Sequence, residues 1–158
     1  MTKISAGLLL YRFKNREIEV FLVHPGGPFW SGKDTGAWSI PKGLVDPDED
    51  TLPAAQREFH EETGFQVSGH FLRLSPVKTK SGKTIQAWAV EGNYDPSEIR
   101  SNTFTVEWPP HSGKQGEFPE VDRAAWFEIK EAKRKIHQGQ VPLIEELERL
   151  VSEKRVCQ

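Results

Sequence analysis

One short segment of the chain combines four glutamates, an arginine and two glycines at fixed intervals around a predicted helix. Between residues 43 and 65 the sequence reads Gly-x5-Glu-x7-Arg-Glu-Phe-x-Glu-Glu-x-Gly-Phe. Asp50 or Thr51 can cap a helix at its start, and Pro53 suits the first turn. Gly64 suits the left-handed position just past the last turn. We therefore expect a helix of about three turns between two loops.

The predicted helix concentrates negative charge on one face. Glu58, Glu61 and Glu62 lie at i, i+3 and i+4 and share that face, next to a stripe of apolar residues. Carboxylates at this spacing repel one another, and Arg57 alone cannot balance three of them. Hard oxygen ligands suit Mg²⁺, which keeps several waters and bridges to substrate phosphates. A solvated acidic face with an ordinary Arg57–Glu61 ion pair is the alternative that the spacing leaves open.

The complete pattern resembles the signature of the Nudix hydrolases at every position. The matching residues are Gly43, Glu49, Arg57, Glu58, Glu61, Glu62 and Gly64, with apolar Phe59 and Phe65. The resemblance extends over nearly the whole chain and implies an α/β fold, an α/β/α sandwich with a mixed sheet and the signature as a loop-helix-loop. It further implies a pyrophosphohydrolase that cleaves a phosphoanhydride bond with Mg²⁺, or with Mn²⁺ in its place.

The resemblance also implies a role for each matched residue. Glu58, Glu61 and Glu62 would hold the divalent metal, together with the backbone carbonyl of Lys42. Arg57 would orient Glu58. Three further matched positions would support this arrangement, and these are Gly43, Glu49 and Gly64.

The general base stays open between Glu58 and a glutamate from a later loop, where Glu117 and Glu120 are the candidates. We favour Glu120 as a catalytic or metal-binding residue. It precedes Trp126 by the six-residue interval that Nudix diadenosine polyphosphate hydrolases have between a loop glutamate and a tryptophan. The alternative is an exposed loop glutamate without a catalytic role.

Five tryptophans are many for a chain of 158 residues. Three of them could offer a flat face to a nucleobase, and these are Trp30, Trp88 and Trp108. Trp38 and Trp126 are expected to pack beside the site. Lys42 could place its cation against a phosphate, whereas lysines 78, 80 and 83 at a predicted turn are more typical of a solvated surface.

Outside the signature, hydrophobic alternation and turn residues predict the remaining elements. Strands are expected at 5–13, 19–24, 67–77, 84–92, 103–108 and 124–129. Residues 109–119 are expected to form a loop. A short helix to residue 137 and an amphipathic helix at 143–151 should close the fold.

Composition favours one domain, residues 1–158, that acts on small molecules. The net charge of −2 gives no general attraction to nucleic acid or to an anionic membrane. The apolar run at 4–11 is too short for a secretory signal, and the chain has no stretch of 18 apolar residues. Cys157 is the single cysteine, which is compatible with a reducing compartment. We therefore expect a cytoplasmic protein with a nucleotide substrate.

Three segments resemble the diadenosine tetraphosphate hydrolase branch, and they are residues 5–8, 38–43 and 83–88. This resemblance implies ATP and AMP as products of diadenosine tetraphosphate. Residues 26–30 and 103–119 depart from that branch. An NTP pyrophosphohydrolase, a hydrolase of other nucleoside diphosphate conjugates and an enzyme for the 5′ end of RNA therefore stay open, the last least favoured because the chain is not basic. A nucleotide-sensing module without catalysis is the alternative from another class, although such modules usually lose signature carboxylates.

Overall fold

The computed structural model describes residues 3–156, with side chains to residue 152, so Cys157 lies outside it. The strands are β1 (Ile4–Lys14), β2 (Glu17–Pro25), β3 (Lys42–Leu44), β4 (Leu72–Arg73), β5 (Val77–Lys78), β6 (Thr84–Glu91), β7 (Thr103–Glu107), β8 (Gln115–Pro119) and β9 (Val121–Glu128). The helices are α1 (Thr51–Thr63), α2 (Ile129–Lys135) and α3 (Val141–Val156), with 3₁₀ turns η1 (Pro96–Glu98) and η2 (Gln138–Gln140). Within these residues, no helix is both long and apolar enough to cross a membrane.

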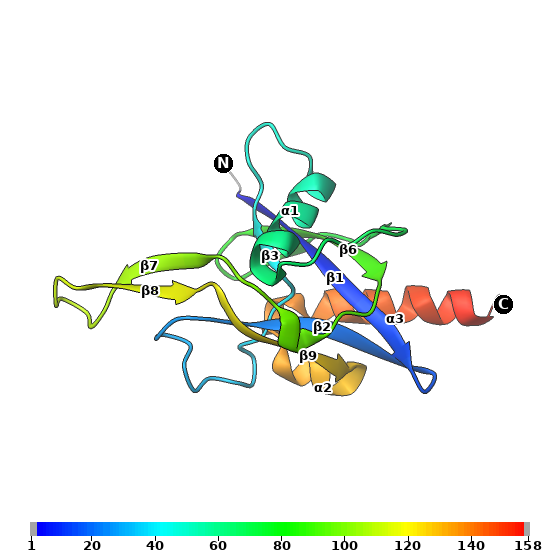
Figure 1. The fold of residues 1–158 in the computed structure, drawn as a ribbon. Helices are drawn as coiled ribbons and strands as arrows, with labels where there is room; N and C mark the ends of the chain where they lie inside the picture. The colour runs from blue at the N-terminus through cyan, green and yellow to red at the C-terminus, as the bar shows by residue number, and fades with distance from the viewer. Residues whose placement is uncertain (1–2, 157–158) are drawn as a thin grey trace.

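The main sheet is mixed and has the order β4-β6-β1-β2-β9, with β3 beside β1 and β5 beside β6. β1 and β6 run parallel, and the other pairings in this sheet are antiparallel. Side chains alternate along the central strands, so each strand supplies both faces. Leu9 and Leu22 belong to the core under α2 and α3, whereas Leu8 and Phe21 belong to the core under α1. The predicted α/β/α sandwich is confirmed (Figure 1).

The signature helix begins and ends close to where its sequence predicts. Gly64 follows α1 with a φ of 81° and donates its N–H to the carbonyl of His60 at 2.8 Å. A Cβ at this position would also lie 3.1 Å from the Cβ of Arg100. Asp50 precedes the helix with an extended backbone, but its side chain makes no capping hydrogen bond. The left-handed end is confirmed, and capping by the Asp50 side chain is not observed.

Two element predictions after the signature helix were wrong. The expected strand at 67–77 is two short strands, β4 and β5, because the chain leaves the sheet between them. There Ser75 donates its N–H to Glu146 on α3 at 2.6 Å, and Pro76 has no N–H to donate. The expected loop at 109–119 ends in strand β8, which pairs with β7 through Phe104 and Phe118.

β7 and β8 form a separate hairpin, which we call the arm, and it projects away from the main sheet (Figure 1). Exposed and half-buried side chains alternate along both of its strands. The arm packs against the loop between β2 and β3, residues 26–37, which we call the Trp30 loop. Phe104 lies against Gly27, and the rings of Trp108 and Phe29 meet edge to face at 5.3 Å.

Candidate active site

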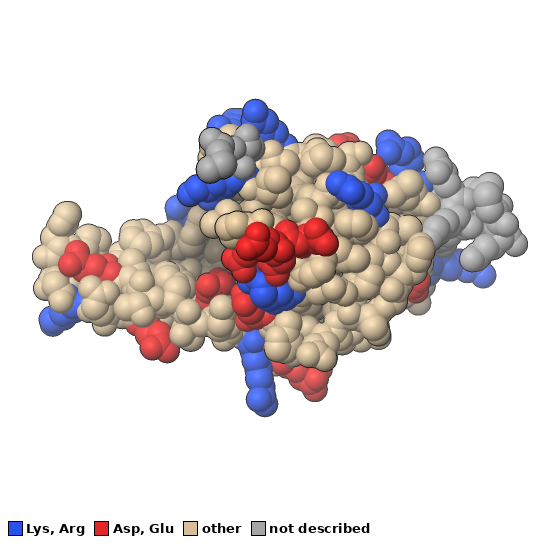
Figure 2. All heavy atoms as spheres, turned by 90° about the horizontal axis from the view of Figure 1, so that it is seen from above, with Lys and Arg blue, Asp and Glu red and all other residues tan. Residues whose placement is uncertain are grey.

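Arg57, in the middle of α1, lies at the centre of a network of carboxylates. Its Nε and Nη2 donate to the two oxygens of Glu49 at 2.9 and 2.8 Å, and this pairing lowers the pKa of Glu49 to about 2. Its Nη1 donates to Glu58 at 2.9 Å and to Glu61 at 3.3 Å. Figure 2 shows the resulting gathering of acidic atoms around basic atoms on this face. The contact that the predicted orienting role of Arg57 requires is therefore present.

Glu58 occupies space that only a glycine at position 43 leaves free. A Cβ built on Gly43 would lie 2.1 Å from the carboxyl carbon of Glu58, far inside van der Waals contact. The Glu58 carboxylate is thus held between β3 and the Arg57 guanidinium. Burial raises its pKa, the charge of Glu61 adds to this, and the charge of Arg57 opposes it.

Glu62 is the most deeply buried carboxylate of the site, with 7% of the residue exposed. Burial raises its pKa to about 9, and the charges of Glu58 and Glu120 act in the same direction. The charge of Lys42 and a hydrogen bond from its backbone N–H oppose the shift. Within the described part of the chain, Glu62 Oε2 has no hydrogen-bond partner. A buried carboxylate in this state either keeps its proton or takes a cation as partner.

Glu120 reaches the same carboxylates from the junction between β8 and β9. Its N–H donates to the carbonyl of Asn102 at 2.9 Å, and the Asn102 N–H in turn donates to the carbonyl of Glu61 at 2.8 Å. The Asn102 amide, oriented with its nitrogen toward Glu120, donates to Glu120 Oε2 at 3.2 Å. Burial and the charge of Glu61 raise the pKa of Glu120. Glu117 instead lies exposed on the arm, so the structure brings only Glu120 of the two loop candidates to α1.

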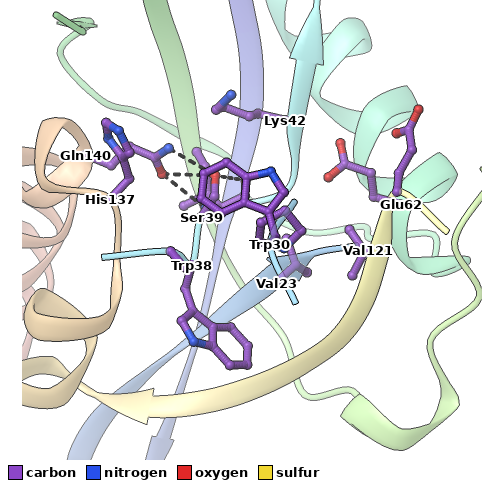
Figure 3. A pocket seen from close by; sticks show the side chains of 13 residues that line it. Val23, Trp30, Trp38, Ser39, Lys42, Glu62, Val121, His137 and Gln140 are labelled. Atoms are coloured by element: carbon purple, nitrogen blue, oxygen red, sulfur yellow. Dashed lines mark hydrogen bonds between the residues drawn. The ribbon is translucent and has the colours of Figure 1, made fainter. Parts of the chain in front are cut away.

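A cavity of about 240 Å³ opens beside these carboxylates. Its lining comes from β2, β3, α1, β9, η2, the Trp30 loop and the junctions between them, and consists of Val23, Pro25, Trp30, Ala37, Trp38, Ser39, Ile40, Lys42, Glu62, Glu120, Val121, His137 and Gln140. In Figure 3, Glu62 lies at one side of the cavity, Gln140 and His137 lie at the other, and the Trp30 indole lies between them. The cavity therefore has a carboxylate end at Glu62 and an opposite end lined by imidazole and amide groups.

Comparison with known proteins decides the family. The NUDIX domain model matches residues 1–147, which is most of the chain. The protein belongs to the Nudix family. This membership confirms the resemblance that the signature indicated.

Curated relatives match shorter segments of this Nudix protein. The asymmetrical bis(5′-nucleosyl)-tetraphosphatase of Rattus norvegicus is 41% identical over 69 residues, which are 40% of this chain and 47% of the rat protein. An RNA pyrophosphohydrolase of Rhodopseudomonas palustris is 49% identical over 49 residues, which are 31% of this chain and 29% of that protein. The matches thus span less than half of these relatives.

A solved structure with the same fold covers nearly the whole chain. The binary complex of the Caenorhabditis elegans Ap4A hydrolase superimposes with a TM-score of 0.67 at 24% identity, over 96% of this chain and 99% of that one. Identity at this level shows the fold alone, and it agrees with the sandwich described above.

The Nudix helix has the chemistry that a divalent cation needs, and Nudix hydrolases generally use such ions. Glu62 Oε2 is buried without a partner among the described side chains, and Glu58 beside it has a raised pKa, so both carboxylates would gain from added positive charge. Over residues 3–152, no three His, Cys, Asp or Glu side chains are gathered into a ready metal cage. Mg²⁺ does not require one, since it usually binds one or two carboxylates and completes its shell with waters and phosphates. The residues present therefore fit such an ion.

The structure separates the three tryptophans that were predicted to contact substrate. Trp30 lines the cavity with 38% of the residue exposed. Trp108 lies on the arm, and Trp88 lies on β6 in the layer against α1, with Arg73 over its ring at 5.6 Å. Neither Trp88 nor Trp108 lines the cavity, so the geometry supports a stacking role for Trp30 alone.

Sequence reasoning missed several residues that shape the site. Asn102 positions Glu120, and Ser39, His137 and Gln140 line the part of the cavity away from Glu62. These four residues lie outside the long helices and strands, so no hydrophobic periodicity in the sequence indicates that they belong to the site. Trp38 packs beside the site as predicted, since it lines the cavity and bonds its indole to Asp34. The Trp126 ring packs against Phe21 and is not part of the cavity lining.

Proposed function

We propose that this protein is an Mg²⁺-dependent hydrolase of diadenosine polyphosphates, which cleaves diadenosine tetraphosphate to ATP and AMP. The observation that carries the proposal is the division of one cavity into two chemical ends. Glu62, Glu120 and Lys42 suit a cation and a phosphate chain, whereas Trp30 offers a half-exposed aromatic face beside the imidazole and amide groups of His137 and Gln140. A nucleotide combines those two parts in one molecule.

In this proposal each residue of the site has one task. Glu58 and Glu62 hold the ion with Glu61 at the exposed rim, and the bound ion supplies charge neutralisation at the phosphate oxygens and activation of water. Arg57 keeps Glu58 in place. Glu120 takes the proton of the attacking water, for which its raised pKa makes it a better base than an ordinary carboxylate. Lys42 contacts the phosphate chain.

The dinucleoside substrate is supported by the three segments that resemble the diadenosine tetraphosphate hydrolase branch and by the rat relative. An NTP pyrophosphohydrolase is the alternative, because the arm and the Trp30 loop reshape the wall where a base would lie. The relative named as an RNA pyrophosphohydrolase favours the 5′ end of RNA as a substrate. The net charge of −2 opposes this, because it gives no general attraction to RNA.

The proposal is tested by incubating the purified protein with Mg²⁺ and diadenosine tetraphosphate and separating the products by ion-exchange chromatography. We expect ATP and AMP in equal amounts, and we expect EDTA to stop the reaction because phosphate charge is then left unbalanced. An intact dinucleotide together with pyrophosphate released from NTPs would select the alternative. Nucleotide binding without turnover of any substrate in such a panel would indicate a sensing module and overturn the enzymatic proposal.

Replacing Glu120 with Gln is expected to lower kcat by on the order of 10²-fold, because the amide cannot accept the proton of water. The Glu117→Gln variant is the matched control, since that carboxylate lies on the exposed face of the arm, and its rate should stay within about twofold of the wild type. Steady-state rates over a range of pH check both. Near-normal turnover in Glu120→Gln would remove Glu120 as the base and return that role to a glutamate of α1.

A further inference from the structure

His24 is a buried histidine at the end of β2 that none of the proposed catalytic steps uses. Only 1% of the residue is exposed. Its Nδ1 lies 2.9 Å from Asp122 Oδ1 on β9, and its Nε2 lies 2.6 Å from the carbonyl oxygen of Lys33. The ring also meets the indole of Trp38 edge to face at 5.2 Å. One side chain thereby joins two strands of the main sheet to the Trp30 loop.

Both polar partners of His24 are acceptors. A backbone carbonyl has no proton to give, so Nε2 is the donor in the hydrogen bond to Lys33. Arg123 lies 3.9 Å from the Asp122 carboxylate that Nδ1 contacts. His24 therefore closes the loop onto the sheet with one ring nitrogen on the loop and the other on β9.

The hydrogen bond to Lys33 fixes more of the Trp30 loop than one residue. Lys33 donates its N–H to the carbonyl of Trp30 at 3.1 Å, and Trp30 donates its N–H to the carbonyl of Gly27 at 3.4 Å. The loop is thus a series of tight turns, and Trp30 lies one turn before Lys33, whose carbonyl bonds to His24. At its other end, Gly26 donates to the carbonyl of Glu120 at 2.8 Å. Trp30 therefore lies between two fixed points when it lines the cavity (Figure 3).

We propose that His24 is a positioning residue, and that its bond to the Lys33 carbonyl holds Trp30 as a preformed wall for the nucleobase. We call the hydrogen bond from His24 Nε2 to the Lys33 carbonyl the latch. The identity of the ligand rests on the proposed function, whereas the latch does not. A loop ordered before binding does not have to be ordered by the ligand, so a broken latch weakens binding more than it slows the chemical step. The latch should therefore govern KM rather than kcat.

Two substitutions separate the two bonds of His24. The amide nitrogen of asparagine can take the place of Nδ1, and that of the longer glutamine can take the place of Nε2. His24→Asn should keep the contact with Asp122 and lose the latch to Lys33, whereas His24→Gln should keep the latch. His70→Asn is the matched control because that histidine is exposed in the segment after α1.

Hydrogen exchange in the absence of any nucleotide measures the latch directly. We expect amides of residues 26–36 to exchange at least about tenfold faster in His24→Asn than in the wild type or in His24→Gln, with α1 and β1 unchanged. With diadenosine tetraphosphate, KM should rise about five- to tenfold in His24→Asn while kcat stays within about twofold. His70→Asn should match the wild type in both measurements.

The outcomes distinguish the latch from the proposed function. Equal exchange in His24→Asn and His24→Gln, or faster exchange throughout the protein, would overturn the latch. Faster exchange confined to residues 26–36 with an unchanged KM would overturn the role of Trp30 as the base wall. If the wild type does not cleave the dinucleotide, the proposed function fails, and the exchange measurement still decides the latch.

Discussion

Replacing Glu58 with Gln is expected to lower kcat by at least about 10²-fold while the protein stays folded. The amide removes the charge that Glu58 would offer to the ion, yet it keeps the size of the side chain and an oxygen that can accept from Arg57 Nη1. Because burial raises the pKa of Glu58, the neutral amide should not lower the melting temperature. Steady-state kinetics and a thermal melt on the same preparation test both statements.

The control for this variant is Glu145→Gln, which removes one exposed carboxylate from α3 and should leave the rate unchanged. A rate within about threefold of the wild type in Glu58→Gln would exclude Glu58 from metal binding and from catalysis. A strongly lowered melting temperature would instead show that Glu58 contributes mainly to the fold.

Replacing Gly43 with Ala is expected to damage activity and stability together. The new Cβ would lie 2.1 Å from the Glu58 carboxyl carbon, so either the carboxylate leaves its place beside Arg57 or β3 shifts away from α1. We expect about 10²-fold lower kcat, comparable with the loss of Glu58 itself, and a cost of about 1–3 kcal/mol in the free energy of unfolding. Kinetics and urea unfolding give the two quantities.

A double-mutant cycle shows whether Gly43 acts through Glu58. In a Glu58→Ala background the space is free, so Gly43→Ala should then cost less than about 0.5 kcal/mol. Gly139→Ala is the control, since a Cβ there meets its nearest neighbour at an ordinary 3.4 Å. An undiminished cost in the Glu58→Ala background would mean that Gly43 serves the backbone of β3 and not the carboxylate.

Helix-end residues and hydrophobic alternation predicted the elements whose own residues fix their bounds and buried faces. Proline in the first turn and Gly64 at the end delimit α1, and the alternation along β1 and β2 predicts a sheet covered on both faces. The break between β4 and β5 depends on Glu146, about seventy residues further on, which accepts the N–H of Ser75. A partner so distant leaves no local pattern.

The candidate site divides in the same way. The carboxylates of α1 and Arg57 are read from one helix, whereas the cavity wall joins segments that meet only after folding. The sequence alone does not distinguish Trp30 from Trp88 as a residue that contacts substrate. In the fold, the latch at His24 holds Trp30 at the cavity, whereas the register of β6 places Trp88 in the layer against α1. His24 itself was predicted only as the end of a strand, because two acceptors on distant segments give a histidine its role.

Hydrogen bonds join the two ends of the arm, among them the one from the Glu120 N–H to the Asn102 carbonyl, and Asn102 is tied to the last turn of α1. A hairpin closed at its base in this way can change in length or sequence without moving its point of attachment. Shortening the arm would leave Glu120 beside the carboxylates and would remove the support that Phe104 gives to Gly27. In the proposed enzyme, a change in the arm would therefore act on ligand preference through the Trp30 loop, whereas a change in α1 would act on hydrolysis.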